Sequence, residues 1–109
     1  MKIVRCSWFP PKGYNAIMLV WWLIVKTGYA ITSRLINHEE IHSVQQKEML
    51  VLFFFIWYGL EFIFRLAQYR NWKKAYMNVS FEREAYANQY DMAYLQNRRM
   101  FSWVKYLRT

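Results

Sequence analysis

The stretch from Arg34 to Tyr69 contains no proline and only one glycine, Gly59. Because proline and glycine are the residues that most disfavour helix interiors, this stretch predicts one long helix, bent near Gly59. Thr32 or Ser33 is suited to cap its first turn, since a hydroxyl oxygen there can accept a hydrogen bond from a free backbone N–H. A helix of this length in a chain of 109 residues makes the fold mostly helical.

The segments before this helix predict a small strand element. The apolar run 16–25 is rich in β-branched and aromatic residues, which favours one buried strand or a bent pair of short strands. After a turn at Thr27-Gly28, residues 29–32 are expected to add a short return strand. Residues 1–13 end in Pro-Pro-Lys-Gly, a composition typical of loops. The N-terminal part therefore contributes the β portion of the fold.

The segments after the long helix predict a connection and a last helix. Residues 70–79 are polar and basic, as expected of a connecting segment. Ser80 is a candidate cap for a long C-terminal helix, in which early acidic side chains suit the helix dipole. The sequence thus predicts a single α+β, mostly α domain over residues 1–109, a length that allows only one core.

The first part of the predicted long helix carries the motif His38-Glu39-x-x-His42, which contains both histidines of the chain. Positions i and i+4 lie on the same face of a helix, so two imidazoles can occupy two corners of a zinc tetrahedron. Glu39 points about 100° around the axis, beside the metal, where it can take a proton from zinc-bound water. The motif predicts a Zn²⁺ site with Glu39 as catalytic base. The alternative is two surface histidines next to a solvated carboxylate.

A hydrolytic zinc site needs a third protein ligand. Lone Cys6 is too little for a thiolate site and excludes an internal disulfide, and no third histidine exists, so the ligand must be a carboxylate. Glu48 and Glu61 lie too far along the helix that carries the motif. The start of the C-terminal helix offers Glu82 and Glu84, which lie about 200° apart, so only one can face the metal. Helix geometry alone does not choose between them.

The order of these motifs resembles the gluzincins, a group of zinc peptidases. Their membrane-associated members show His-Glu-x-x-His, then an apolar segment, then Glu-x-x-Ala or Glu-x-x-x-Asp, and here Glu82-Arg-Glu-Ala85-Tyr86 stands in that place. The resemblance covers residues 37–88. It implies a minimal zincin-like domain that acts on a peptide or protein substrate, with Glu82 as the third ligand. It also implies that small Ala85 lets two helices approach.

The chain departs from this family pattern at Tyr86. The family usually has an aspartate there, which can hold a zinc-bound histidine in one tautomer. Asp91 and Glu84 are the acidic residues available to replace it, though neither has the usual spacing. Tyr86 is instead a candidate stabiliser of the transition state, as are Tyr76 and Tyr90. The departure leaves a second interpretation, a catalytically inactive, zinc-stabilised structural or regulatory protein associated with the membrane.

Composition predicts contact with a membrane. Hydrophobic residues make up 56% of the chain and aromatic residues 21%, more than one small core needs, and the net charge is +8. Residues 49–60 are apolar on every side, yet the run falls short of the roughly 20 residues of a spanning helix. The expected location is therefore the membrane, integral or peripheral, on its cytoplasmic side. The alternative is a soluble cytoplasmic protein. Formation of an oligomer is another way to bury the aromatic residues that the core does not need.

Two further classes are disfavoured by the sequence. The basic residues are spread along the chain without a nucleic-acid-binding motif, so no specific nucleic-acid partner is expected. Lys2 and Arg5 precede the apolar run 16–25 in an order that loosely resembles a signal peptide. Pro10-Pro11 and Lys26 argue against that interpretation, because they fall where such a peptide is apolar or small.

Overall fold

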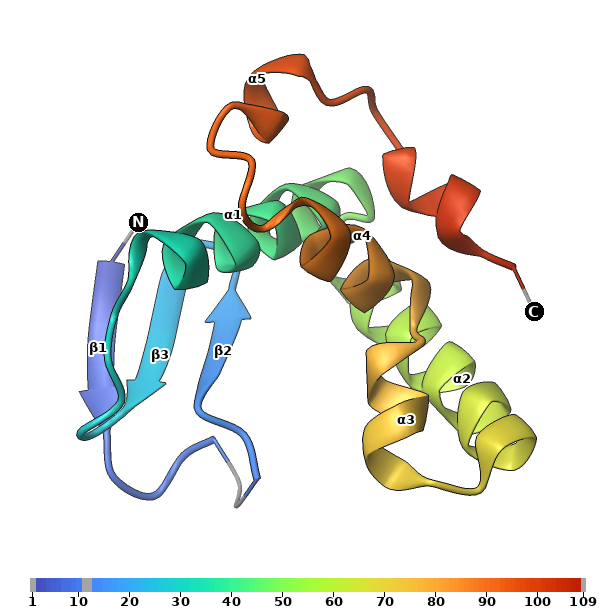
Figure 1. The fold of residues 1–109 in the computed structure, drawn as a ribbon, viewed down its shortest axis with the longest axis horizontal. Coiled ribbons are helices and arrows are strands. Elements are labelled where there is room, and N and C mark those ends of the chain that lie inside the picture. The colour runs from blue at the N-terminus through green and yellow to red at the C-terminus, as the bar shows by residue number, and fades with distance from the viewer. Residues whose placement is uncertain (1, 11–12, 109) are drawn as a thin grey trace.

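A computed structural model describes residues 2–10 and 13–108 of the chain (Figure 1). The elements in chain order are β1 (Lys2–Cys6), β2 (Ala16–Leu19), β3 (Trp22–Lys26), α1 (Ser33–Glu48), α2 (Leu52–Tyr69), α3 (Trp72–Met77), α4 (Ser80–Asn88), α5 (Tyr94–Asn97) and a 3-10 helix (Ser102–Tyr106). The predicted α+β, mostly α fold is confirmed. Figure 1 shows the small sheet below the N-terminal part of α1, α4 beside the C-terminal part of that helix, and α2 and α3 extending away from that end.

The sheet has the order β1-β3-β2, with β1 parallel and β2 antiparallel to β3. Strands β2 and β3 form a hairpin, so the predicted bent pair of short strands in residues 16–25 is confirmed. Strand β1 lies where a loop was expected. Its side chains are mostly exposed, so the strand carries no apolar alternation and is recognised only by its backbone pairing with β3.

The predicted return strand at residues 29–32 is wrong. This segment carries the chain back to α1 without pairing, and Tyr29 and Ile31 pack instead against the core between sheet and helix. That core is built from Met18, Leu23, Val25 and Leu35. The predicted cap is confirmed, because Thr32 Oγ1 accepts a hydrogen bond of 3.1 Å from the backbone N–H of Leu35.

The long helix bends at residues 49–51 and not near Gly59, which lies inside α2. Helices α1 and α2 meet at 111°. The N–H of Val51 donates to Gln46 O at 2.6 Å and the N–H of Leu50 to Lys47 O at 3.2 Å, the bond pattern of a Schellman helix end. Leu50 and Val51 have φ of 53° and 59°. Glycine usually marks such a left-handed end, so the sequence gives no signal for it.

The C-terminal helix is shorter than expected, because α4 ends at Asn88. Ser80 is not its cap. The Glu61 carboxylate of α2 instead accepts bonds from Ser80 N at 2.7 Å and from Ser80 Oγ at 2.6 Å, placing a negative charge at the positive end of α4. The predicted connection at residues 70–79 contains a short helix, α3. A second core of Phe54, Val79, Phe81 and Trp103 fixes α4 against α2.

Among the described helices, none is by itself both long and apolar enough to cross a bilayer. Only α1 and α2 taken together meet that requirement, by length and composition alone, and they are bent by 111° where they join.

Candidate metal centre

Helices α1 and α4 bring His38, His42 and Glu82 together in the interior. Each residue is about 5% exposed, and their ligand atoms all lie within 4.8 Å of one another. Glu82 Oε1 lies 3.3 Å from His38 Nε2 and 3.0 Å from His42 Nε2. Tetrahedral zinc with bonds near 2.0–2.1 Å spaces its ligand atoms about 3.3 Å apart. The group is therefore compatible with a metal site, formed by the three residues that the sequence singled out.

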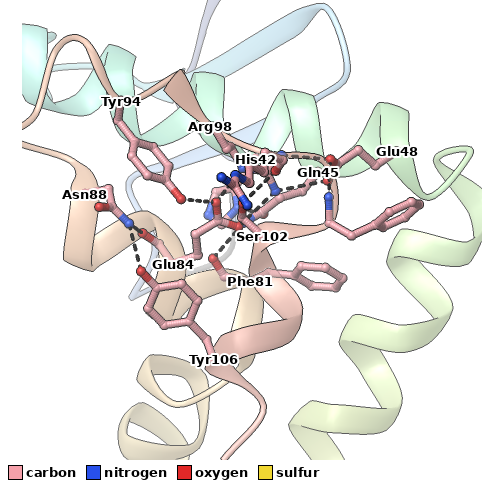
Figure 2. A network of polar contacts seen from close by, with 12 residues as sticks. His42, Gln45, Glu48, Phe81, Glu84, Asn88, Tyr94, Arg98, Ser102 and Tyr106 are labelled. Atoms are coloured by element: carbon pink, nitrogen blue, oxygen red, sulfur yellow. Dashed lines mark hydrogen bonds and ion pairs between the residues drawn. The ribbon is translucent and has the colours of Figure 1, made fainter. Parts of the chain in front are cut away.

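The ring of His42 is oriented by a buried amide (Figure 2). His42 Nδ1 lies 2.8 Å from Gln45 Oε1, while Gln45 Nε2 donates to Glu84 Oε1 at 2.9 Å and to Phe81 O at 3.1 Å. A carboxylate and a carbonyl can only accept, so the amide oxygen of Gln45 must face the histidine. His42 Nδ1 is then the donor, and Nε2 is the nitrogen directed at the metal position.

The other two ligands are oriented in the same way. His38 Nδ1 lies 2.9 Å from Gln89 Oε1, and the backbone O of Gln89 accepts from Asn37 Nδ2 at 2.9 Å. Glu82 Oε2 accepts from the hydroxyl of Tyr58 at 2.8 Å. Each ligand thus has one polar atom bound by a neighbouring side chain and the other directed at a common point, which is how protein metal sites preorganise their ligands.

The charges at this point also favour a cation. Burial acts to lower the pKa of His42, but the negative charge of Glu82 and its hydrogen bond outweigh burial and raise the pKa to about 9. Burial acts to raise the pKa of Glu82, but the positive charge of His42 and hydrogen bonds from both histidines bring it well below its usual range. The site therefore stabilises a carboxylate next to a positive charge, which a bound divalent ion would supply.

Glu39 lies beside the three ligands and lines two cavities. One is apolar, has a volume of about 290 Å³ and is also lined by Phe54, Phe55 and Phe62; the other has a volume of about 430 Å³. Glu39 is 7% exposed and has no hydrogen-bond partner within residues 2–10 and 13–108. Burial raises its pKa more than the nearby histidines lower it. Glu39 is thus a carboxylate that lines both cavities and has no hydrogen-bond partner among the described residues.

Of the remaining predicted residues, Glu84, Tyr86 and Tyr76 lie around this centre, whereas Tyr90 is 74% exposed and lines neither cavity. Glu84, the alternative third ligand, is fully buried and is bound to Gln45, Tyr94 and Arg98 rather than directed at the histidines. The ring of Tyr86 contacts the ring of His38 with centroids 4.5 Å apart. Its hydroxyl lies 3.3 Å from that of Tyr76, which lines both cavities.

Sequence reasoning missed the residues that orient the ligands. The outer ring nitrogens of the two histidines contact Gln89 and Gln45, and not Asp91 or Glu84. Gln45 lies on the same helix face as His42 three residues earlier, a spacing that was available as a signal. Gln89 caps the end of α4 in a helical conformation and follows Glu82 by seven residues, or about two turns, so it lies on the same helix face and its spacing was likewise available as a signal.

Comparison with known proteins gives no relative. No family model, no curated protein and no solved structure matches the chain. The class of protein is therefore defined by fold and site alone: a small, mostly helical α+β protein with a buried His-His-Glu group that can hold a metal ion.

Replacing Gln45 by Leu should weaken metal binding by about 10- to 100-fold, because the ring of His42 loses the acceptor that orients it. Competition with a chromophoric chelator measures the affinity. Gln46→Leu is the matched control, since Gln46 is equally buried but binds the backbone of Met18 and Val20 instead of a histidine. Equal affinities in both variants would show that Gln45 does not orient the ligand.

Proposed function

We propose that this protein is a zinc-dependent metallopeptidase that hydrolyses peptide or protein substrates. The observation that carries the proposal is the position of Glu39, a buried carboxylate with no hydrogen-bond partner in the described part of the chain, next to the converging atoms of His38, His42 and Glu82. The same arrangement of residues in sequence is what makes the chain resemble the gluzincins.

Zinc suits the donor set better than other common ions. Two imidazole nitrogens and one carboxylate oxygen at near-tetrahedral spacing are typical of catalytic zinc, whereas magnesium and calcium prefer oxygen ligands in larger shells. When bound, zinc polarises a scissile carbonyl and makes a water molecule acidic near neutral pH.

Glu39 is the proposed general base and acid. It accepts the proton of the attacking water at its carboxylate and then donates it to the nitrogen of the leaving amine. A raised pKa helps this exchange, because a base works best when its pKa is close to the working pH. Tyr86 is the proposed donor to the developing oxyanion. Its neighbour Tyr76 lines the same cavity and is a second candidate donor.

Strand β2 offers a place for an extended substrate. It is an edge strand. Because Asn15 O accepts from Lys26 N, the backbone N–H and C=O groups of residues 15 and 17 face β3. The backbone groups of Ala16 and Met18 therefore face away from the sheet, beside the apolar cavity that these two residues help to line. Gln46 Nε2 donates to Met18 O at 2.7 Å, so Met18 O is already bound. Ala16 is therefore the position for main-chain pairing with a peptide.

A catalytically inactive, zinc-stabilised protein is the second candidate. The ligands join α1 to α4, and Tyr58 extends the contact to α2, so a metal would fasten three helices together. The absence of the family aspartate at Tyr86 agrees with this function.

Incubation of the zinc-loaded protein with a mixed peptide library, followed by mass spectrometry, tests the proposal. We expect cleavage that is lost on treatment with a chelator and restored by adding zinc. Bound zinc without cleavage across the library would reject peptidase activity and leave the structural function.

A further inference from the structure

Helix α2 buries its charged residues and exposes its apolar ones, which is the reverse of a helix that faces water. Its two charged residues, Glu61 and Arg65, are only 7% and 2% exposed and lie 3.5 Å apart. Large apolar side chains instead face outward: Leu52, Phe53, Phe55, Ile56, Trp57, Leu60, Ile63 and Phe64. Amphipathic helices of water-soluble proteins have the opposite arrangement, so this face, here called the α2 apolar face, requires an apolar environment.

The buried charges fix the helix in this orientation. Glu61 binds the first residue of α4 through both of its oxygens, and Arg65 donates to Arg108 O at 2.8 Å and to Gln68 Oε1 at 3.0 Å. Rotating α2 to bury its apolar face would expose these contacts and break them. The outward direction of the apolar side chains is therefore part of the fold.

Cations and an exposed tryptophan follow the C-terminal end of α2. Arg70, Lys73 and Lys74 are all exposed and follow α2 directly, and Trp72 between them is 60% exposed. Lysine and arginine next to an apolar helix face are attracted to anionic lipid headgroups, and tryptophan favours the boundary between headgroups and acyl chains. The net charge of +8 acts in the same direction.

The width of the face favours lipid over a protein partner. At 100° per residue, the exposed apolar positions extend over about 200° of the helix circumference. A single protein surface covers a narrower stripe of a helix, whereas acyl chains and headgroups can pack around the convex surface of the whole face.

We propose that the α2 apolar face binds the surface of an anionic lipid bilayer, with α2 lying along the surface and its apolar side chains among the upper acyl chains. Arg70, Lys73 and Lys74 contact the headgroups. Phe55 belongs to this face and also lines the apolar cavity beside Glu39, so binding holds the candidate metal centre next to the lipid. The proposal does not depend on metal or on catalysis.

Flotation of the full-length protein with vesicles tests it. The vesicles consist of phosphatidylcholine alone or of phosphatidylcholine with phosphatidylglycerol. We expect binding to the anionic vesicles that weakens with salt, and a loss of about tenfold or more in the double variant Leu60→Gln, Ile63→Gln. Both side chains are more than 60% exposed, so the substitution leaves the core intact. The matched control is Met92→Gln, Met100→Gln, which replaces exposed apolar residues elsewhere and should bind as the parent does.

Three outcomes would overturn the proposal. In the first, the two double variants bind vesicles equally well. In the second, the protein binds neutral and anionic vesicles equally well. In the third, the protein binds no vesicles and forms oligomers, and the Leu60→Gln, Ile63→Gln variant is a monomer. The last would show that a second copy covers the face. Glu39→Gln should bind vesicles as the parent does, so failure of the peptidase proposal and failure of this one are distinguishable.

Discussion

Glu39→Gln should lower kcat/KM for peptide cleavage by about 10²- to 10⁴-fold while the protein keeps its metal. Glutamine has nearly the same shape as glutamate but cannot accept and return a proton. Glu39 lies outside the group of atoms that converge on the metal position, so its replacement should leave the three ligands in place. Cleavage rates of a peptide found in the library screen, measured beside metal content, give both quantities.

Glu40→Gln is the matched control, because it makes the same change at the next position, where the side chain is exposed. It should cleave as the parent does. If Glu39→Gln retained parental cleavage, the base would be another group and the mechanism proposed here would be wrong. If both variants lost activity together with metal, the loss would reflect altered folding instead of missing chemistry.

Arg98→Met should destabilise the fold by about 3–5 kcal/mol. Arg98 follows α5 and is paired with two carboxylates, Glu48 of α1 and Glu84 of α4 (Figure 2). Its nitrogens contact Glu48 at 2.8 and 3.0 Å, and its side chain is only 2% exposed. Burial opposes its charge, but hydrogen bonds to both carboxylates raise the pKa of Arg98 above its ordinary value. Without it, Glu84 remains buried with no opposite charge.

Arg99→Met is the control for this prediction, because Arg99 is the neighbouring exposed arginine and should change stability by no more than about 0.5 kcal/mol. Urea unfolding followed by circular dichroism measures both variants. Since Glu84 also accepts from Gln45, which orients His42, the Arg98 variant should bind metal more weakly as well. A stability equal to that of Arg99→Met would show that the buried pair adds nothing.

The two histidines could be predicted because their geometry is local, since His38 and His42 share a helix face by their spacing alone. Glu82 was preferred to Glu84 only by the resemblance to the gluzincins, and the structure brings it to the same point as the histidines. The mostly helical fold followed from the same kind of information, namely the long stretch without proline and the apolar run before it.

The rest depends on contacts between residues distant in sequence. Arg98 and Glu48 are 50 positions apart, and no pattern in either segment links them. The bend at residues 49–51 uses Leu50 and Val51 in left-handed conformations that sequence rules assign to glycine. Strand β1 exists only because β3 offers it an edge. Such features are set by tertiary packing, which a single sequence does not display.

The central claim is that His38, His42 and Glu82 hold a metal ion. Elemental analysis of the purified protein after dialysis against zinc, beside His38→Ala treated in the same way, tests it most directly. We expect about one zinc per parental chain and almost none in the variant, because two protein ligands bind zinc much more weakly than three. A parental protein that takes up no zinc, or a His38→Ala variant that retains as much as the parent, would contradict the claim.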